Sequence, residues 1–302
     1  MNLIIGTRGS KLAMKQTQIV VDSLIRKGFD VEIKKIKTSG DIFLEKSLKE
    51  FAGKGAFVSE INDMIVRGDI DAAVHSMKDV PTMLPDEVSI AAVLPRASRK
   101  DVLISDYKLK NLPEGATVGT SSTRRKAQLL RIRRDLQVTD IRGNINTRIK
   151  KLKDYNAIIM AKAGLDRLDI KVEIEELPFI TSAGQGAIAV ASKKGSKMDE
   201  ILKDLNDQKT RIETEIEREI LGGLGGGCVV PMGVAAEVTK DRINVEAEVL
   251  SLDGVRQVYV KRSVKNTKDL KLQNYRDFTV KIVVELKEKG GVDLIEEAVK
   301  SW

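Results

Sequence analysis

Leu3-Ile-Ile-Gly-Thr-Arg-Gly-Ser10 opens with an apolar run and closes with a short polar turn. Apolar side chains then recur at helical spacing to about residue 27, and residues 31–36 alternate between apolar and polar as a strand does. The same order continues with helices expected at residues 44–51 and 58–67 and strands at residues 70–74 and 88–94. This β-α-β-α-β order predicts a parallel sheet with helices on both of its faces.

A second unit of the same kind is expected to begin near residue 102. Its strands are predicted at residues 102–105, 117–119, 138–141 and 157–161, and helices follow the last three. Residues 187–191 are predicted to return as a strand of the first unit, which makes the second unit an insertion. Two segments then cross between the units, and we expect a hinged cleft between them.

The last third of the chain predicts a small α+β unit. Alternating residues at 234–238, 243–252 and 255–264 indicate a three-stranded antiparallel sheet, with helices before and after it. We therefore expect an α/β protein of three domains. Their predicted boundaries are residues 1–95 with 187–206, residues 96–186, and residues 207–302.

Positive charge is concentrated in one part of the chain. Residues 99–151 hold fourteen Lys or Arg against five Asp or Glu, whereas the whole chain of 302 residues carries a net charge of +8. This surplus indicates an anionic partner for the second unit. Tyr107 is the only aromatic residue in residues 99–151, so this segment offers no stacking platform for bases. A small polyanion fits at least as well as a nucleic acid.

The compartment is predicted from what the sequence lacks. No run approaches the roughly twenty apolar residues of a membrane span, and the N-terminus does not resemble a secretion signal. The chain has a single cysteine, which is typical of a reducing environment. We expect a cytoplasmic protein with no membrane partner.

Three predicted strands are each followed by a turn rich in Gly, Ser, Thr and Arg and then by a helix. These turns are Thr7-Arg-Gly-Ser10, residues 120–125 and residues 142–148. Helix N–H groups, hydroxyls and guanidinium groups together bind carboxylates or phosphates, and open α/β sheets bind ligands at this end of their strands. The alternative is ordinary helix capping beside solvated arginines. Three such turns in one cleft favour an anion site.

Three further positions carry reactive groups. Cys228 follows five glycines and precedes Pro231, so it is a covalent attachment point, a nucleophile or a small buried residue. Lys78-Asp79 follows a predicted strand, where the carboxylate would stabilise a cationic intermediate or form a surface salt bridge. His75 is the only histidine and has no partners for a metal site, so we expect a structural role and no bound metal.

Seven motifs in order resemble the porphobilinogen deaminase family, also called hydroxymethylbilane synthases. They are Thr7-Arg-Gly-Ser10, Gly53-Lys-Gly-Ala-Phe57, His75-Ser-Met-Lys-Asp-Val-Pro81, Gly119-Thr-Ser-Ser-Thr-Arg-Arg125, Arg142-Gly-Asn-Ile-Asn-Thr-Arg148, Gly184-Gln-Gly-Ala187 and Gly226-Gly-Cys-Val-Val-Pro231. The resemblance implies two periplasmic-binding-protein-like β/α domains with a hinged cleft and a small C-terminal domain. It also implies an enzyme that joins four porphobilinogen molecules head to tail into hydroxymethylbilane, with release of ammonia.

The resemblance also assigns roles to residues. It implies a dipyrromethane cofactor joined by a thioether to Cys228 and a catalytic carboxylate at Asp79. The residues that it implies for the carboxylates of substrate and cofactor are Arg8, Ser10, Lys78, Thr120, Ser122, Arg124, Arg125, Arg142, Arg148 and Arg167. Others expected around the cleft are Gln16, Lys54, Phe57, Asn144 and Gln185. We expect a monomer that acts on porphobilinogen and binds no nucleic acid.

Two other functions remain open from the sequence. A two-lobed anion-binding protein without catalysis would explain the cleft and the arginines, but it leaves the Cys228 loop without a purpose. A nucleic-acid-binding protein would explain the basic segment and predicts binding that weakens steeply with salt.

Overall fold

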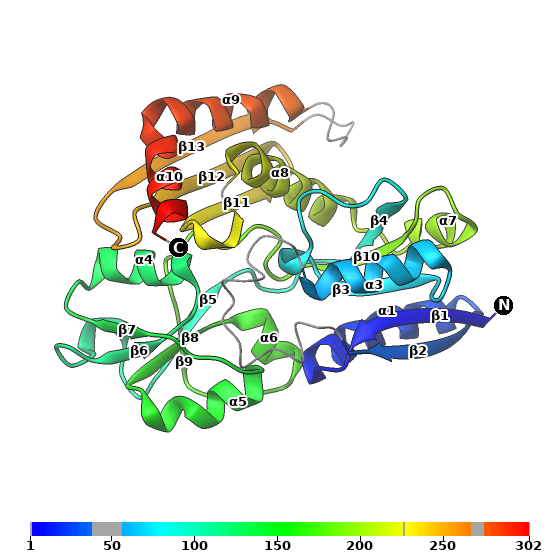
Figure 1. Cartoon of the computed structure of the whole chain (residues 1–302), viewed down its shortest axis with the longest axis horizontal. Coiled ribbons are helices and arrows are strands. Elements are labelled where there is room, and N and C mark those ends of the chain that lie inside the picture. The colour runs from blue at the N-terminus through cyan, green and yellow to red at the C-terminus, as the bar shows by residue number, and fades with distance from the viewer. Residues whose placement is uncertain (1, 38–55, 226, 267–274, 302) are drawn as a thin grey trace.

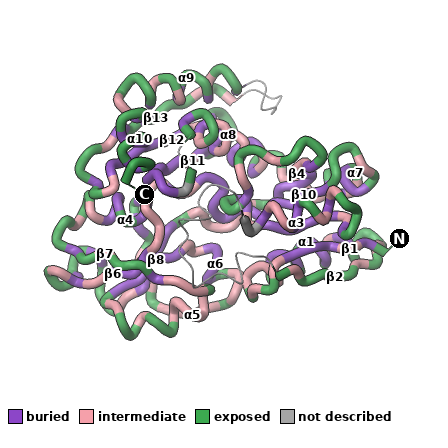
Figure 2. The backbone as a smooth tube through the Cα atoms, in the orientation of Figure 1, coloured by how far each residue is buried: buried purple, intermediate pink, exposed green. Residues whose placement is uncertain are grey.

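The computed structural model describes residues 2–37, 56–225, 227–266 and 275–301. Its strands form three sheets in three units, which are arranged around a common junction (Figure 1). The strands are mostly buried, whereas the outer helices each leave one face exposed (Figure 2). The helix predicted at residues 44–51 lies outside the described residues.

The first unit is a five-stranded sheet in the order β2-β1-β3-β10-β4. Its strands are β1 (Asn2–Arg8), β2 (Asp30–Ile36), β3 (Ala72–Ser76), β4 (Val88–Val93) and β10 (Ile188–Lys193), and its helices are α1 (Lys11–Arg26), α3 (Ala56–Arg67) and α7 (Lys197–Lys203). Leu3 of β1 packs with Leu24 of α1 on one face of the sheet, and Ala73 of β3 packs with Ile65 of α3 on the other. The predicted helices on both faces are therefore present.

The second unit is also a five-stranded sheet, in the order β7-β6-β8-β5-β9. Its strands are β5 (Asp101–Ile104), β6 (Thr117–Gly119), β7 (Gln137–Thr139), β8 (Ala157–Ala161) and β9 (Ile174–Glu176), and its helices are α4 (Thr123–Ile132), α5 (Ile145–Lys150) and α6 (Lys162–Arg167). The sequence did not predict β9, because three residues with two glutamates carry no strand pattern.

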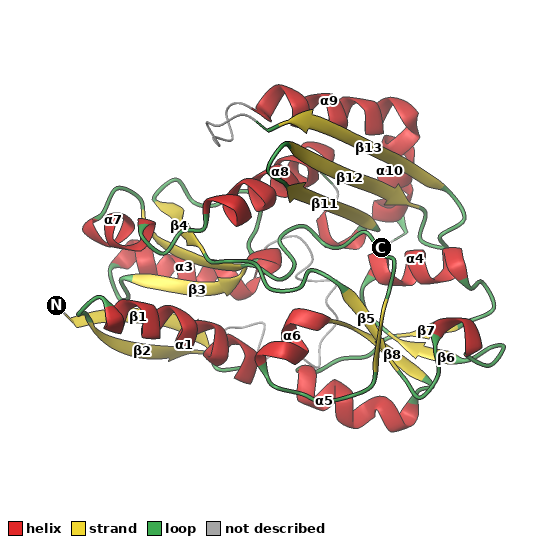
Figure 3. Cartoon of the chain, turned by 180° about the vertical axis from the view of Figure 1, so that it is seen from behind, coloured by secondary structure: helices red, strands yellow, loops and turns green. Residues whose placement is uncertain are grey.

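The third unit is an antiparallel sheet in the order β11-β12-β13, covered by helices. Its elements are α8 (Gln208–Leu224), the short helix η5 (Gly227–Val229), β11 (Met232–Val238), β12 (Arg242–Leu250), β13 (Gln257–Lys265), α9 (Arg276–Leu286) and α10 (Val292–Lys300). Ile216 of α8, Val245 of β12 and Ile282 of α9 belong to one apolar core. From behind, α4 of the second unit lies next to this third unit (Figure 3).

The fold class predicted from the sequence is confirmed, and β1 to β4 of the first sheet run in the same direction as the β-α-β-α-β order predicts. The strands that follow the two crossings run the other way. β10 runs antiparallel to both β3 and β4, and β5 runs antiparallel to both β8 and β9. Each of these two strands follows a crossing from the other unit, so it enters its sheet from the opposite end. We propose that the domain boundaries lie where the sequence places them, since every strand of each sheet falls inside the corresponding range.

A buried carboxylate joins the two crossings to the third unit. Both oxygens of Glu217 on α8 accept hydrogen bonds from Arg96 of the first crossing, at 2.9 Å each. The same carboxylate accepts from the backbone N–H of Gly184 in the second crossing at 2.7 Å and of Ala236 on β11 at 3.0 Å. Because Glu217 is fully buried, these partners replace the water that its charge would otherwise need.

Candidate functional site

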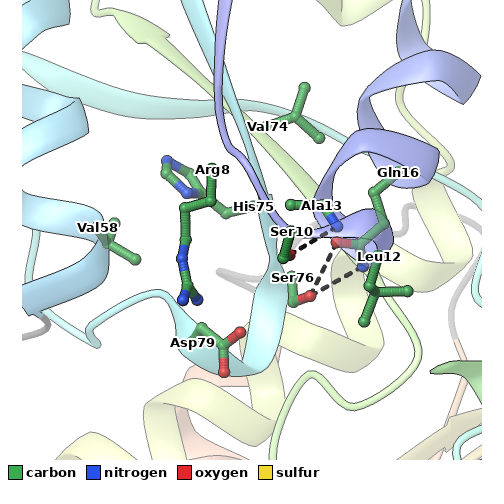
Figure 4. A pocket seen from close by; sticks show the side chains of 10 residues that line it. All are labelled: Arg8, Ser10, Leu12, Ala13, Gln16, Val58, Val74, His75, Ser76 and Asp79. Atoms are coloured by element: carbon green, nitrogen blue, oxygen red, sulfur yellow. Dashed lines mark hydrogen bonds between the residues drawn. The ribbon is translucent and has the colours of Figure 1, made fainter. Parts of the chain in front are cut away.

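A pocket opens at the ends of β1 and β3, where two of the predicted motifs meet (Figure 4). It is lined by Arg8, Ser10, Leu12, Ala13, Gln16, Val58, Val74, His75, Ser76 and Asp79. The Arg8 side chain extends along the pocket toward Asp79 (Figure 4). The pocket therefore joins a cation, a carboxylate and neutral hydrogen-bonding groups in one place.

Asp79 lies at the end of a short helical turn, Met77–Asp79, that directly follows β3. Its side chain is exposed to solvent. The backbone just beyond it is held from the third unit, because Arg218 of α8 donates hydrogen bonds to the carbonyl oxygens of Val80 at 2.7 Å and Pro81 at 2.5 Å. The turn thus presents an exposed carboxylate on a fixed backbone.

Polar side chains from α1 and β3 form the opposite wall of the pocket. The Oγ of Ser10 accepts a hydrogen bond from the N–H of Ala13 at 3.2 Å and so caps α1. The Gln16 amide and the Ser76 hydroxyl hydrogen-bond to each other at 2.9 and 3.1 Å. Together these contacts fix the orientation of α1 relative to the turn that carries Asp79.

His75 is buried beside Arg8 in the pocket. Burial, together with the positive charge of Arg8, lowers the pKa of His75 to about 4. The imidazole is therefore neutral at physiological pH. A neutral, buried ring is consistent with the structural role predicted for His75.

Lys78 links the pocket to the second unit electrostatically. Its side chain is accessible to solvent, yet many protein atoms lie near its ammonium group and partly desolvate it. This desolvation, with the positive charge of Arg125, lowers the pKa of Lys78 to about 8, although Asp79 and Asp101 oppose the shift. Lys78 is therefore a cation that gains from any additional negative charge.

Asp101 holds the two adjacent arginines of α4. Its carboxylate lies 2.8 Å from Arg124 and 2.7 Å from Arg125, and the amide of Gln185 donates to it at 3.0 Å. Burial alone would raise the pKa of Asp101, but the charges of Arg125 and Arg124 hold it well below its usual range. Three predicted site residues are thus brought together around a carboxylate that the sequence analysis did not single out.

Replacing this carboxylate should destabilise the fold strongly. Asp101→Asn leaves two buried guanidinium groups without a counter-ion, which typically costs about 3–5 kcal/mol when one partner of a buried pair is removed. The matched control is Asp135→Asn, since Asp135 pairs with Arg133 at the surface, where ion pairs contribute little. Urea denaturation of both variants tests this, and equal midpoints would contradict it.

Three other predicted residues of the second unit lie between the ends of its strands and the starts of its helices. Ser122 caps α4 by accepting from the N–H of Arg125, and Asn144 caps α5 by accepting from the N–H of Thr147. Thr120 is buried, and its hydroxyl accepts from the N–H of Ser122 at 3.3 Å. Capping and anion binding are therefore not exclusive, since the capping residues also place the arginines.

Three further arginines of the predicted site are half-buried. Arg148 donates to the carbonyl of Gly143 at 2.8 Å, Arg167 donates to that of Gly186 at 2.6 Å, and Arg142 is half-buried at the start of its turn. Within the described ranges, neither Arg148 nor Arg167 forms a salt bridge. Burial, with the positive charge of Arg125, lowers the pKa of Arg148, so an anion would stabilise its charged form.

Some predicted site residues cannot be placed. Lys54 lies outside the described residues. Phe57 is in α3 and Cys228 is in η5, but their side chains are likewise outside what is described. Among the described residues, no group of three or more His, Cys, Asp or Glu side chains is arranged to hold a metal ion. No helix in the described ranges is both long and apolar enough to cross a membrane.

Three residues of this region were missed by the sequence analysis. Ser76 lies inside the motif that ends at Pro81, and this position is the only sequence feature that points to a place in the site. Asp101 is one of five acidic residues in the basic segment, and nothing in the sequence distinguishes it as the buried partner of Arg124 and Arg125. Nothing near Arg218 in sequence points to the distant carbonyl groups that it binds.

Comparison with known proteins covers nearly the whole chain. Residues 3–200 match a family model described as porphobilinogen deaminase, dipyrromethane cofactor binding domain, and residues 211–287 match the porphobilinogen deaminase C-terminal domain. A probable porphobilinogen deaminase of Methanococcoides burtonii is 44% identical, covering 98% of this chain and 97% of that protein. One from Methanocella arvoryzae is 45% identical, covering 98% of each.

One further relative and one solved structure are also similar to the chain. The porphobilinogen deaminase of Campylobacter fetus is 42% identical and covers 84% of this chain and 86% of that protein. Among solved structures, the methionine-binding protein MetQ is similar with a TM-score of 0.44 and 10% identity, covering 68% of this chain and 89% of that one. The two family models and the near full-length identities show that the chain belongs to the porphobilinogen deaminase family.

Proposed function

We propose that this chain joins four porphobilinogen molecules head to tail into hydroxymethylbilane, releasing ammonia at each addition, in tetrapyrrole biosynthesis. The observation that carries the proposal is the exposed carboxylate of Asp79 in a pocket with Arg8, beside the cationic groups of Lys78 and the second unit. Family membership over almost the full length supports it. The enzyme is a transferase, and its substrate carries two carboxylates.

The residues of the site fit a dipyrromethane cofactor attached to Cys228. Pyrrole rings bearing acetate and propionate groups need cations, and Arg148 and Arg167 have guanidinium groups that no described carboxylate occupies. When bound, the cofactor supplies a pyrrole carbon to which the first substrate is joined. Cys228 follows five glycines in the sequence, and a stretch without side chains suits the attachment of a bulky group.

Asp79 acts on the carbon that loses ammonia. When the C–N bond of porphobilinogen breaks, ammonia leaves and the remaining methylene-pyrrole carries a positive charge. The Asp79 carboxylate stabilises this charge and holds the pyrrole N–H. A C–C bond then forms to the free α-carbon of the growing chain, and that carbon loses its proton, which the Asp79 carboxylate of the pocket accepts.

The arginines and lysine bind and orient. Arg8 and Lys78 hold substrate carboxylates beside Asp79, and Arg142, Arg148 and Arg167 hold those of the growing chain. Arg124 and Arg125 already pair with Asp101, so their contribution is the positive potential at the start of α4 together with any hydrogen-bonding capacity left over.

Substrate binding should weaken as the pH rises through about 8. Because the pKa of Lys78 is lowered to about 8, its ammonium form is present below that pH and is lost above it. The KM for porphobilinogen should therefore rise between pH 7.5 and 9, and Lys78→Met should have a higher KM that lacks this rise. Initial rates at several pH values measure both. A KM of Lys78→Met that still rises as in the wild type would contradict the assignment.

The compartment, oligomeric state and partners of the enzyme are proposed from the composition of the chain and the chemistry of its substrate. We propose a cytoplasmic monomer that binds neither nucleic acid nor membrane, in line with the single cysteine and the small polyanionic substrate. The second candidate function is a two-lobed anion-binding protein without catalysis, which the arginine-lined site also accommodates.

One experiment separates the two candidates. The purified protein is incubated with porphobilinogen, and the product is followed by the absorbance of the porphyrin that forms from hydroxymethylbilane on cyclisation and oxidation. Release of one ammonia per porphobilinogen consumed supports the enzyme. Binding of porphobilinogen with neither ammonia nor product would favour the anion-binding protein.

A further inference from the structure

Residues 178–185, which we call the strap, run from β9 toward β10 and contact all three units. At its far end, the N–H of Gly184 donates to Glu217 of the third unit, and the amide of Gln185 donates to Asp101 of the second. The strap therefore lies where a shift of one unit is transmitted to the others.

Gln128 of α4 binds the near end of the strap in both directions. The N–H of Ile180 donates to its Oε1 at 2.8 Å, and its Nε2 donates to the carbonyl oxygen of Ile180 at 2.9 Å. Arg124 donates to the same carbonyl at 2.9 Å. Gln128 is only 5% exposed, so water cannot replace these bonds. Its side chain thus binds the Ile180 backbone as a neighbouring strand would.

The third unit holds the strap from the other side. The N–H of Val234 on β11 donates to the carbonyl oxygen of Thr181 at 2.9 Å. A Cβ atom added to Gly233 would lie 2.6 Å from the carbonyl oxygen of Ile180, which shows how closely the two backbones approach. β11 begins at Met232, four residues after Cys228. The strap thus lies between α4 and the start of the strand that follows the Cys228 loop.

This arrangement connects two parts of the site that must act together. The start of α4 carries the Ser122 cap and the pair Arg124 and Arg125, while β11 follows the loop that anchors the growing chain. We propose that Gln128 is a positioning residue, which through Ile180 holds the root of the Cys228 loop at a fixed distance from the cationic start of α4. The inference rests on the function proposed above.

Misplacement should affect elongation more than cofactor attachment. Each addition requires the free end of the anchored chain to meet Asp79 in a reactive geometry, and a displacement of about 1 Å costs on the order of a hundredfold in rate. Attachment to Cys228 does not require the anchored chain to reach Asp79, so we expect a shift of β11 to affect attachment less than elongation.

The test compares Gln128→Met with wild type as holoenzymes. Methionine keeps the length of the side chain and removes both hydrogen bonds. We expect the same covalent mass excess as in the wild type and a kcat reduced about tenfold or more, with KM little changed. Intact masses during turnover should show accumulated species with one or two added substrate units. The control is Gln137→Met on the exposed edge strand β7, which should behave as the wild type.

A second variant reaches the same contact from the opposite side. Gly233→Ala pushes β11 away from Ile180 without altering α4, and it should produce the same accumulation of partly elongated species. If Gln128→Met does not fold, the distribution of bound species in Gly233→Ala tests the proposal by itself. A purely structural role would lower the folded fraction and all products in proportion, leaving the distribution of bound species unchanged.

The outcomes separate this inference from the function on which it rests. A wild-type protein that never gains pyrrole mass from porphobilinogen would contradict the proposed function itself. Wild-type elongation combined with an unchanged distribution of species in the folded variants would overturn the role of Gln128 alone.

Discussion

Asp79→Ala should fold normally and lose at least about a thousandfold in turnover, because positioned general acid–base groups and charge-stabilising groups each contribute roughly a hundredfold to several thousandfold. The side chain is exposed at the end of the turn after β3, so its removal leaves no buried group without a partner. The backbone stays fixed, since Arg218 binds the carbonyls that follow. Steady-state rates and thermal unfolding measure the two halves of this expectation.

The matched control for this variant is Asp86→Ala. Asp86 is an exposed carboxylate in the same loop, but it does not line the pocket. The Asp86→Ala variant should retain wild-type turnover. This result would show that losing one negative charge near the basic site does not by itself reduce activity. Turnover of Asp79→Ala within tenfold of the wild type would remove Asp79 from the proposed chemistry.

Cys228→Ser should abolish covalent attachment of the pyrrole chain and, with it, all product formation. A serine hydroxyl is a far weaker nucleophile than a thiolate at neutral pH, so no comparable ether bond is expected. Wild-type protein, denatured before mass spectrometry, should exceed its sequence mass by two linked pyrrole units, and Cys228→Ser should match the bare chain. A mass excess retained in Cys228→Ser would refute this attachment site.

The single cysteine supplies an internal control for that experiment. Because the chain has one cysteine, titration of the denatured protein with a thiol reagent reports on this position alone. Holoenzyme should show no free thiol, and apoprotein made without precursor should show one. Adding porphobilinogen to the apoprotein should then consume the thiol as the mass increases.

The elements that carry a local pattern were predictable from the sequence. The spacing of apolar residues located α1 and the three strands of the third unit to within a few residues. The polar turns identified Ser10, Ser122 and other capping positions, because capping depends only on residues three or four apart. Strand direction was not predictable in the same way, since it depends on which unit a chain segment enters from.

The long-range polar contacts of the site could not be read from the sequence. Asp101 is 23 residues from Arg124, and Arg218 is 138 residues from Val80, so no spacing rule joins them. The family resemblance did indicate that Arg8, Ser10, Gln16 and Asp79 belong together, and the pocket contains all four. The contacts that Asp101 and Arg218 make around the site could not be predicted, because they depend on how the three units pack together.

The Glu217 junction has a consequence for the order in which the chain folds during synthesis. Until α8 and β11 have been made, Arg96 and the N–H of Gly184 lack the carboxylate that binds them in the finished protein. A nascent chain ending before residue 207 thus holds two lobes whose connecting segments are unsatisfied. We expect the lobes to acquire their final relative orientation only after the ribosome has released β11, near the end of translation.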